Sequence, residues 1–268
     1  MQDTSMDLAA NDLMRSGASN YLWRLLATGA SFVLFGLGGL LLRLVVLPML
    51  GLLPGDAVTR RRRARAAISR AFYLHVRFMY RSGVLEYEFV GAERLGQPGQ
   101  MIIANHPSLI DVVFLIAHIR DTNCIVKQSL WRNPCTRGPV RRAQYISNNG
   151  SPDMLEQAAD ALREGQTLIV FPEGTRTLPD QAPVFHRGAA AIALRGARVI
   201  TPVFIHVKPT TLTKAEPWYR IPQRRVRVTL RVGQDISPQC FNAQAAAPIA
   251  SRRLNAYLHQ LFLKELSP

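Results

Sequence analysis

The sequence predicts an α/β fold, a mostly parallel sheet flanked by helices, with a membrane-anchoring helical segment on its N-terminal side. Two observations predict it. From about residue 84 onward, short apolar runs typical of strands alternate with stretches of helical length and spacing. Before that point, one long uncharged apolar run dominates the chain. We therefore expect a polar N-terminal tail at 1–24, a membrane anchor with an Arg-rich interfacial helix at 25–83, and a folded domain at 84–268.

The apolar run is long enough to cross a membrane. Residues 25–42 carry no charge, and after Arg43 the run resumes over 44–53. A straight helix over both parts would extend about 43 Å at ~1.5 Å per residue, against a hydrocarbon layer of about 30 Å. Three glycines between 36 and 39, together with Pro48, favour a loosened or kinked helix. A single tilted span and a shallow bent insertion from one face both remain open, and a buried core helix is the disfavoured alternative.

A cluster of arginines follows this run. Arginine occupies eight positions between residues 60 and 81, and apolar residues recur among them at helical spacing. The pattern predicts an amphipathic helix at the membrane surface, where anionic lipid contributes ~1 kcal/mol per nearby arginine. The positive-inside tendency places it, and the domain after it, on the cytoplasmic face of a bacterial-type inner membrane.

Composition supports contact with lipid. Charged residues make up 19% of the chain, below the roughly 25% of average soluble domains. The net charge of +15 favours anionic partners, which include anionic lipids, nucleic acids and acidic carrier proteins. No nucleic-acid-binding signature accompanies the arginines, so a nucleic-acid partner is not expected. Three cysteines without a CxxC spacing favour a reducing compartment.

The alternation in the folded domain predicts its individual elements. Strands are expected at 85–90, 101–104, 124–126, 143–146, 167–171, 199–205 and 226–232. Helices are expected at 107–119, 154–163, 189–195 and 249–266.

The first block of chemically capable residues is Asn105-His106-Pro107-Ser108-Leu109-Ile110-Asp111. It lies where a strand ends and a helix begins, the usual place for ligands in α/β sheets. Pro107 suits the first helical position, which would leave His106 at the cap. Asp111 could then hold one imidazole nitrogen and leave the other as a base, with backbone N–H groups after Pro107 as oxyanion donors. Taken alone, a histidine and an aspartate at this spacing more often have a structural role than a catalytic one.

The second block is Phe171-Pro172-Glu173-Gly174-Thr175-Arg176-Thr177, a turn after an apolar strand. The planar fork of Arg176 suits a phosphate, and Glu173 could bind a hydroxyl or hold an arginine in place. The alternative is a surface turn with a Glu–Arg ion pair of little energetic consequence.

Taken together, the two blocks resemble the glycerolipid acyltransferase family that includes the bacterial 1-acylglycerol-3-phosphate acyltransferases, with its NHxxxxD and FPEGTR signatures. They stand in the family's order, about 65 residues apart. The likeness continues through Phe185, Gly188, Ala189 and the Val-Ile-Thr-Pro-Val stretch at 199–203, and covers roughly residues 80–235.

The resemblance implies transfer of a fatty acyl group from acyl-CoA or acyl-ACP to a hydroxyl of a lysophospholipid-like acceptor in phospholipid biosynthesis, with no other cofactor. His106 would be the general base, oriented by Asp111. The substrate-binding set would include Glu173 and Arg176 at the polar head, with Gly174 and Thr175 shaping their turn, and Asn105 and Ser108 from the first block. No GxSxG elbow supports a covalent acyl-enzyme.

One position departs from the family pattern. Members acting on lysophosphatidic acid usually carry an arginine where Asn148 stands here. Arg141 and Arg142 lie just upstream and could replace its charge, or could be solvated loop residues. The acceptor could therefore be a lysophospholipid, an ornithine-type lyso-lipid or another hydroxylated lipid.

Three other interpretations remain weaker. They are an acyltransferase for a non-glycerolipid hydroxyl, a catalytically inactive lipid- or carrier-binding relative, and a metal hydrolase. An inactive relative would be expected to lack His106 or Asp111, and both are present. No metal site is expected, because His118, His186 and His206 are scattered without metal-ligand spacing.

Overall fold

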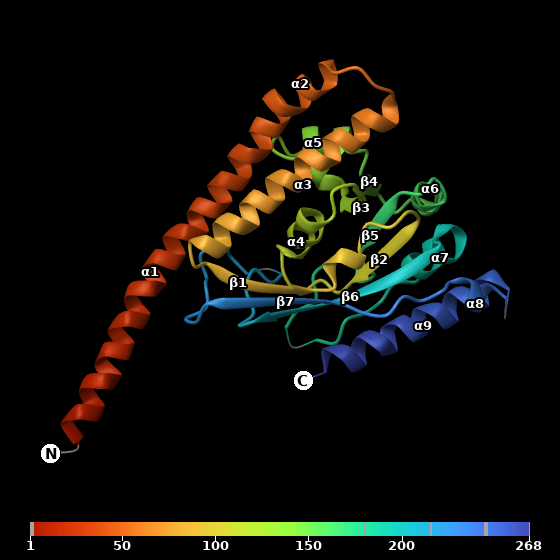
Figure 1. Ribbon diagram of the computed structural model, residues 1–268. Coiled ribbons are helices and arrows are strands. Elements are labelled where there is room, and N and C mark those ends of the chain that lie inside the picture. Colours follow the sequence, from red (N-terminus) through yellow and green to blue (C-terminus); the bar gives the residue numbers. More distant parts are fainter. Residues whose placement is uncertain (1–2, 180, 215, 244–245, 268) are drawn as a thin grey trace.

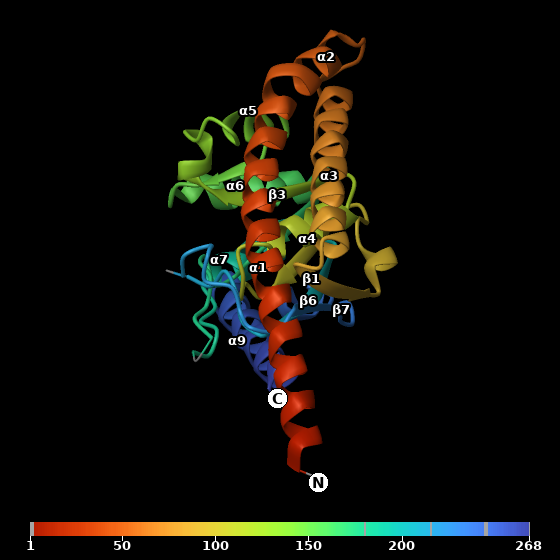
Figure 2. The same ribbon diagram turned by 90° about the vertical axis from the view of Figure 1, so that its left-hand side faces the viewer.

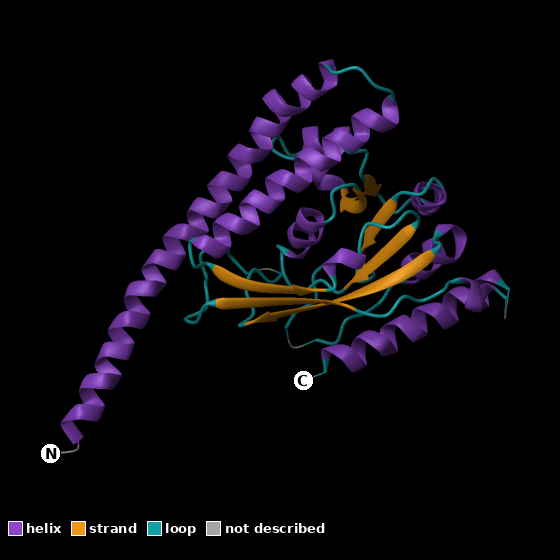
Figure 3. Cartoon of the chain, in the orientation of Figure 1, coloured by secondary structure: helices purple, strands orange, loops and turns teal. Residues whose placement is uncertain are grey.

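The computed structural model describes residues 3–179, 181–214, 216–243 and 246–267. Its folded domain has three layers, with helices on both faces of a seven-stranded sheet (Figure 1 and Figure 3). The sheet order is β1-β7-β6-β2-β5-β3-β4, and every neighbouring pair is parallel except β6 and β7. The strands are β1 (Leu85–Val90), β2 (Gln100–Ala104), β3 (Thr122–Lys127), β4 (Ile146–Asn148), β5 (Thr167–Val170), β6 (Val199–Lys208) and β7 (Val226–Val232). The predicted fold class is confirmed.

The helices divide between the two faces of the sheet because its central strands β2 and β5 are buried on both sides. In β2, Ile102 and Ala104 pack into one core with α3 and α4, whereas Met101 and Ile103 pack into the other with α6, α7 and α9. The helices are α1 (Asp3–Leu41), α2 (Leu47–Leu52), α3 (Ala57–Arg81), α4 (Asp111–His118), α5 (Arg137–Arg142), α6 (Pro152–Arg163), α7 (Arg187–Gly196), α8 (Gln239–Asn242) and α9 (Ala247–Leu266).

The N-terminal segment is one long bent helix beside α3 (Figure 1 and Figure 2). It begins at Asp3, so the polar tail and the apolar run are helically continuous. A π-helical turn, Leu42–Val46, joins α1 to α2, where Pro48 lacks the N–H that would continue the regular bonding. The expected irregularity therefore lies at the proline. Gly39 serves close packing instead, since a Cβ there would stand 2.6 Å from the Cys135 carbonyl oxygen.

Two expected elements differ from the structure. The helix expected at 107–119 begins only at Asp111, because the Ser108 N–H donates to the Asp111 carboxylate and the Leu109 N–H donates to the Leu212 carbonyl. The strand expected at 143–146 is displaced, since β4 starts at Ile146 and Ala143 caps α5. The sequence pattern did not predict α5.

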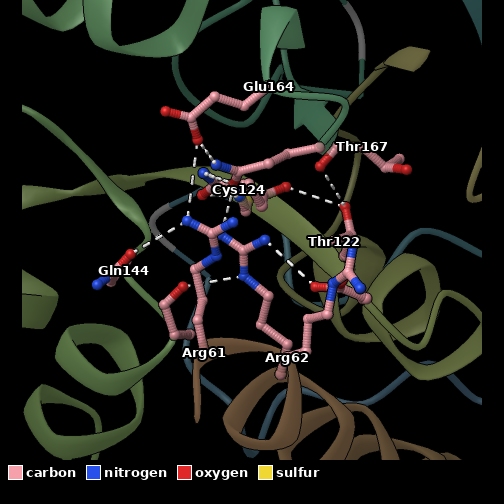
Figure 4. A network of polar contacts seen from close by, with 12 residues as sticks. Arg61, Arg62, Thr122, Cys124, Gln144, Glu164 and Thr167 are labelled. Carbon is pink, nitrogen blue, oxygen red and sulfur yellow. Dashed lines mark hydrogen bonds and ion pairs between the residues drawn. The ribbon is translucent and has the colours of Figure 1, made fainter. Parts of the chain in front are cut away.

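Helix α3 does not present all of its arginines to solvent or lipid. Arg65 has 2% of its surface exposed and donates to the Ala143 carbonyl, to Asp121 Oδ1 and to Gln166 Oε1, at 2.9, 3.3 and 2.9 Å. Arg61 also faces the domain, toward Gln144 and Glu164, in the polar network of Figure 4. The expectation of an interfacial arginine cluster is therefore corrected for these two side chains, because Arg65 is buried against acceptors of the domain and Arg61 faces polar groups at the domain surface.

Because of His75 on α3, the free energy of unfolding is expected to depend on pH. Its ring meets the Phe35 ring of α1 edge-on, with centroids 5.4 Å apart, and burial lowers the pKa of His75 to about 4. The unfolded chain binds this proton near pH 6.5, so stability should fall between pH 6.5 and 4, by up to about 3 kcal/mol. Urea unfolding of the His75→Phe variant at pH 7 and pH 4.5 should show a smaller difference than the parent. The exposed-site variant His186→Phe should keep the parent's difference, and an unchanged difference for His75→Phe would contradict the assignment.

Candidate active site

The two sequence blocks meet at one edge of the sheet. His106 follows β2 and the turn at 172–177 follows β5, and these strands are parallel neighbours. The carboxyl ends of parallel neighbours lie side by side, so the sheet itself brings the imidazole to the FPEGTR turn.

His106 and Asp111 form a hydrogen-bonded pair. Nδ1 of His106 lies 2.9 Å from Oδ2 of Asp111, and the Ser108 N–H donates to the same oxygen at 2.7 Å. The Asp111 side chain has no exposed surface, and burial raises its pKa, while the bonds from His106 and Ser108 act in the opposite direction. A carboxylate on Nδ1 selects the tautomer with its proton there, which leaves Nε2 as the acceptor.

Glu173 ties the two blocks together. Its Oε1 accepts the His106 N–H at 3.0 Å, and its Oε2 accepts the Thr177 hydroxyl. The Thr177 N–H donates to the His106 carbonyl at 3.1 Å, and the Phe171 ring stacks on the imidazole with centroids 4.3 Å apart. Burial raises the pKa of Glu173. Both carboxylate oxygens therefore engage protein donors, which assigns Glu173 to the positioning of His106.

Arg176 holds a neighbouring loop. Its Nη1 donates to the carbonyls of Leu212 and Thr213, each at 2.8 Å, and Leu212 also accepts the Leu109 N–H. Within the described residues, both hydrogen bonds of this guanidinium use Nη1. Arg176 thus joins the loop at 212–213 to the turn beside His106.

The remaining predicted substrate-binding residues have different positions. Asn105 joins β2 to β6 through both amide atoms, to Ile205 N and O at 2.8 Å. Ser108 is fully buried and contributes its backbone N–H. Gly174 has φ +65°, a conformation that favours glycine, and Thr175 is half-buried in the same turn.

Arg141 and Arg142 do not lie at this edge. They line a small cavity with residues of α2 and α3, such as Leu47 and Ala57, so they do not replace the charge expected at Asn148. Their segment is helix α5, which packs against α3 and carries them toward the α2–α3 connection.

Two contacts of His106 were not predicted, those with Phe171 and Thr177. Both residues belong to the second block, but their contacts with His106 depend on the β2–β5 pairing. Lys127 ends β3, which pairs with β5 in parallel, so it stands at the same sheet edge as the FPEGTR turn.

Two cavities adjoin the His–Asp turn. One, about 410 Å³, is almost wholly apolar and lies between α1, α3 and α4, with Leu109, Ile110 and Val113 in its wall. The other, about 310 Å³, is lined by His106, Glu173 and polar residues that include Lys208. A base between an apolar and a polar cavity can activate the hydroxyl of an amphiphilic molecule.

Comparison with known proteins finds similarity to acyltransferases. The model of the Acyltransferase family matches residues 86–206. A 1-acyl-sn-glycerol-3-phosphate acyltransferase of Saccharomyces cerevisiae is 28% identical over 187 residues, covering 64% of this chain and 57% of that protein. A probable enzyme of the same name from Mycoplasma pneumoniae is 29% identical over 140 residues, covering 48% and 52%.

The chain spans about half the length of the curated relatives it matches, from 36% to 57%. The crystal structure of the 1-acyl-sn-glycerophosphate acyltransferase PlsC from Thermotoga maritima shares the fold, with a TM-score of 0.69 over 94% of this chain and 98% of that one at 18% identity. Residues 86–206, which contain His106, Asp111 and most of the sheet, thus match the acyltransferase family.

Proposed function

We propose that this protein is an O-acyltransferase that moves a fatty acyl group from an acyl-CoA or acyl-ACP thioester to a hydroxyl of a lysophospholipid-like acceptor. The observation that carries the proposal is the His106–Asp111 pair at 2.9 Å, set between an apolar and a polar cavity. The names of the matched relatives support the same class of reaction.

In the proposed reaction, Nε2 of His106 removes the proton from the acceptor hydroxyl as its oxygen attacks the thioester carbonyl. The tetrahedral intermediate then collapses, the C–S bond breaks, and the thiolate takes the proton back from the imidazolium. Asp111 keeps the imidazole in the required tautomer and stabilises its protonated form. The acyl group passes directly to the acceptor, without an acyl-enzyme.

The apolar cavity suits a fatty acyl chain. Its lining comes from α1, α3 and α4, including Phe35, Phe72 and Ile116, and it reaches the catalytic turn at Leu109. Burial of a methylene group contributes about 0.8 kcal/mol, so a cavity of this kind binds chains with strength that rises with their length.

The acceptor's anionic head is proposed to bind at the Nη2 side of the Arg176 fork, since the two hydrogen bonds of this guanidinium within the described residues both use Nη1. Replacing Arg176 with lysine keeps the charge but removes bidentate geometry, so the acceptor KM should rise about tenfold while the donor KM changes less than twofold. Steady-state kinetics with each substrate varied in turn measures both constants. Arg187→Lys, at an exposed position outside the site, is the matched control, and an unchanged acceptor KM would exclude Arg176 from head-group binding.

The outer face of α1 is proposed to lie in a membrane surface. The segment Asn20–Leu52 qualifies by length and composition as a membrane-crossing helix. Its inner face packs on the domain at Arg24, Thr28 and Ser31, while the outer face exposes leucines and valines. A helix packed along the domain in this way favours shallow insertion over a separate span. Exposed aromatic side chains near its middle suit the membrane–water interface: Trp23, Tyr80, Trp218 and Tyr219.

The test is a matrix of donors and acceptors. Purified full-length protein is incubated with radiolabelled palmitoyl-CoA or palmitoyl-ACP and with lysophosphatidic acid, other lysophospholipids, or a lyso-ornithine lipid. Transfer of label to one acceptor class, absent in the His106→Ala variant, is expected. Lipid binding without label transfer from either donor would favour the inactive-relative alternative.

A further inference from the structure

A further cavity, which we call the α1–α3 groove, opens between the N-terminal helix and α3, away from the turn that holds His106 and Asp111. Its volume is about 1030 Å³. The two helices that form it lie side by side in Figure 2. The groove is lined by Leu34, Gly38, Leu41, Leu42, Val46, Leu50, Thr59, Arg62, Arg63, Ala66, Ala67, Arg70, Ala71, Leu74, His75, Phe78, Arg120 and Asp121.

The groove combines apolar walls with a cationic rim. Four arginines line it, at positions 62, 63, 70 and 120, against one carboxylate, Asp121. Asp121 is already shared between Arg62, at 3.2 Å, and the buried Arg65, at 3.3 Å. The rim therefore carries an excess of positive charge beside a wall of leucine and alanine.

We propose that the α1–α3 groove binds one intact anionic phospholipid, with its phosphate at the arginine rim and an acyl chain along the apolar wall. The proposal rests on the membrane association proposed above. An acidic carrier protein would find the same charge, but its polar surface would not fill the apolar wall formed by residues such as Leu41, Leu74 and Phe78. The exposed leucines of α1 also continue directly from the groove toward the expected lipid phase.

This lipid is distinct from the substrates. None of His106, Asp111, Glu173 or Arg176 lines the groove. However, the groove and the apolar cavity beside the catalytic turn share a wall, to which Leu34, Gly38, Leu42, Ala71 and His75 all contribute. A phospholipid in the groove therefore contacts the back of the wall that faces the proposed acyl chain.

The experiment measures binding of fluorescent phosphatidylglycerol to the full-length protein in neutral detergent micelles, with phosphatidylcholine as the uncharged comparison. Neutral micelles remove the general attraction of a charged membrane surface. The Arg70→Gln/Arg120→Gln double variant should lose at least tenfold in affinity. Arg77→Gln/Arg81→Gln, which removes equal charge from exposed positions of α3 outside the groove, should stay within twofold of the parent.

A second measurement uses a variant in which a larger side chain fills the groove. Ala66→Phe leaves every arginine in place but should lower phosphatidylglycerol affinity at least fivefold by occupying the apolar wall. Any of three outcomes would overturn the proposal. The two double variants could lose the same affinity for phosphatidylglycerol, the parent could bind both lipids equally, or acyl carrier protein could displace the lipid. Because binding is measured without turnover, a negative result here is separable from the absence of acyltransferase activity.

Discussion

Replacing His106 with alanine is expected to reduce turnover at least a hundredfold while leaving the folded structure and lipid association unchanged. An alcohol is a poor nucleophile at neutral pH, and a positioned base contributes about 10²–10⁴ in rate. Within the part of the chain that the structure describes, the side chain forms one hydrogen bond, with Asp111, so truncation removes the base without disturbing the sheet. Single-turnover rates with saturating donor and acceptor measure the loss.

Two companion variants separate catalysis from folding. Asp111→Asn removes the negative charge that stabilises the protonated imidazole and fixes its tautomer, so it should also lose about 10²–10⁴ in turnover. His186→Ala, at an exposed position, should retain turnover within a fewfold. Retention of activity in His106→Ala would remove this residue as the base, whatever the behaviour of the other variants.

The central strands β2 and β5 could be predicted to within one residue because buried parallel strands are short, continuous apolar runs. The expected bounds of β7 agree with the structure because its residues alternate between apolar and polar, as in a strand with one buried face. Strand β4 could not be located in the same way. It lies at the sheet edge and pairs over only three residues with β3, so tertiary packing rather than local pattern determines where it starts.

Within the site, residue spacing was sufficient to predict the His106–Asp111 pair but not the residues that surround it. The turn before α4 closes through the Asp111 carboxylate, a contact that spans five residues. The contact between Glu173 and the His106 N–H spans 67 residues and exists only because β2 and β5 are neighbours. A spacing pattern cannot show that both carboxylate oxygens of Glu173 accept hydrogen bonds from the protein, and so the sequence suggested only a head-group ligand.

The second large effect is expected at Arg65, which the sequence pattern placed in the interfacial cluster. Replacing it with methionine keeps a long apolar stem but removes the donors to Ala143, Asp121 and Gln166. Loss of a buried charged partner costs about 3–5 kcal/mol when the other charge stays buried. Asp121 is 37% exposed and can regain water, so a loss of about 2–4 kcal/mol is expected, measured as the free energy of unfolding in urea.

Arg62 is the matched control for this prediction, because it pairs with the same carboxylate from one turn earlier on α3. Its side chain is 68% exposed, and exposed ion pairs contribute about 0–1 kcal/mol. Arg62→Met should therefore change the free energy of unfolding by less than about 1 kcal/mol. Equal losses in the two variants would mean that Asp121, rather than the buried acceptors of the domain, is the important partner. A large loss in Arg65→Met alone would show that this arginine fastens α3, and with it the lining of the apolar cavity, to the sheet.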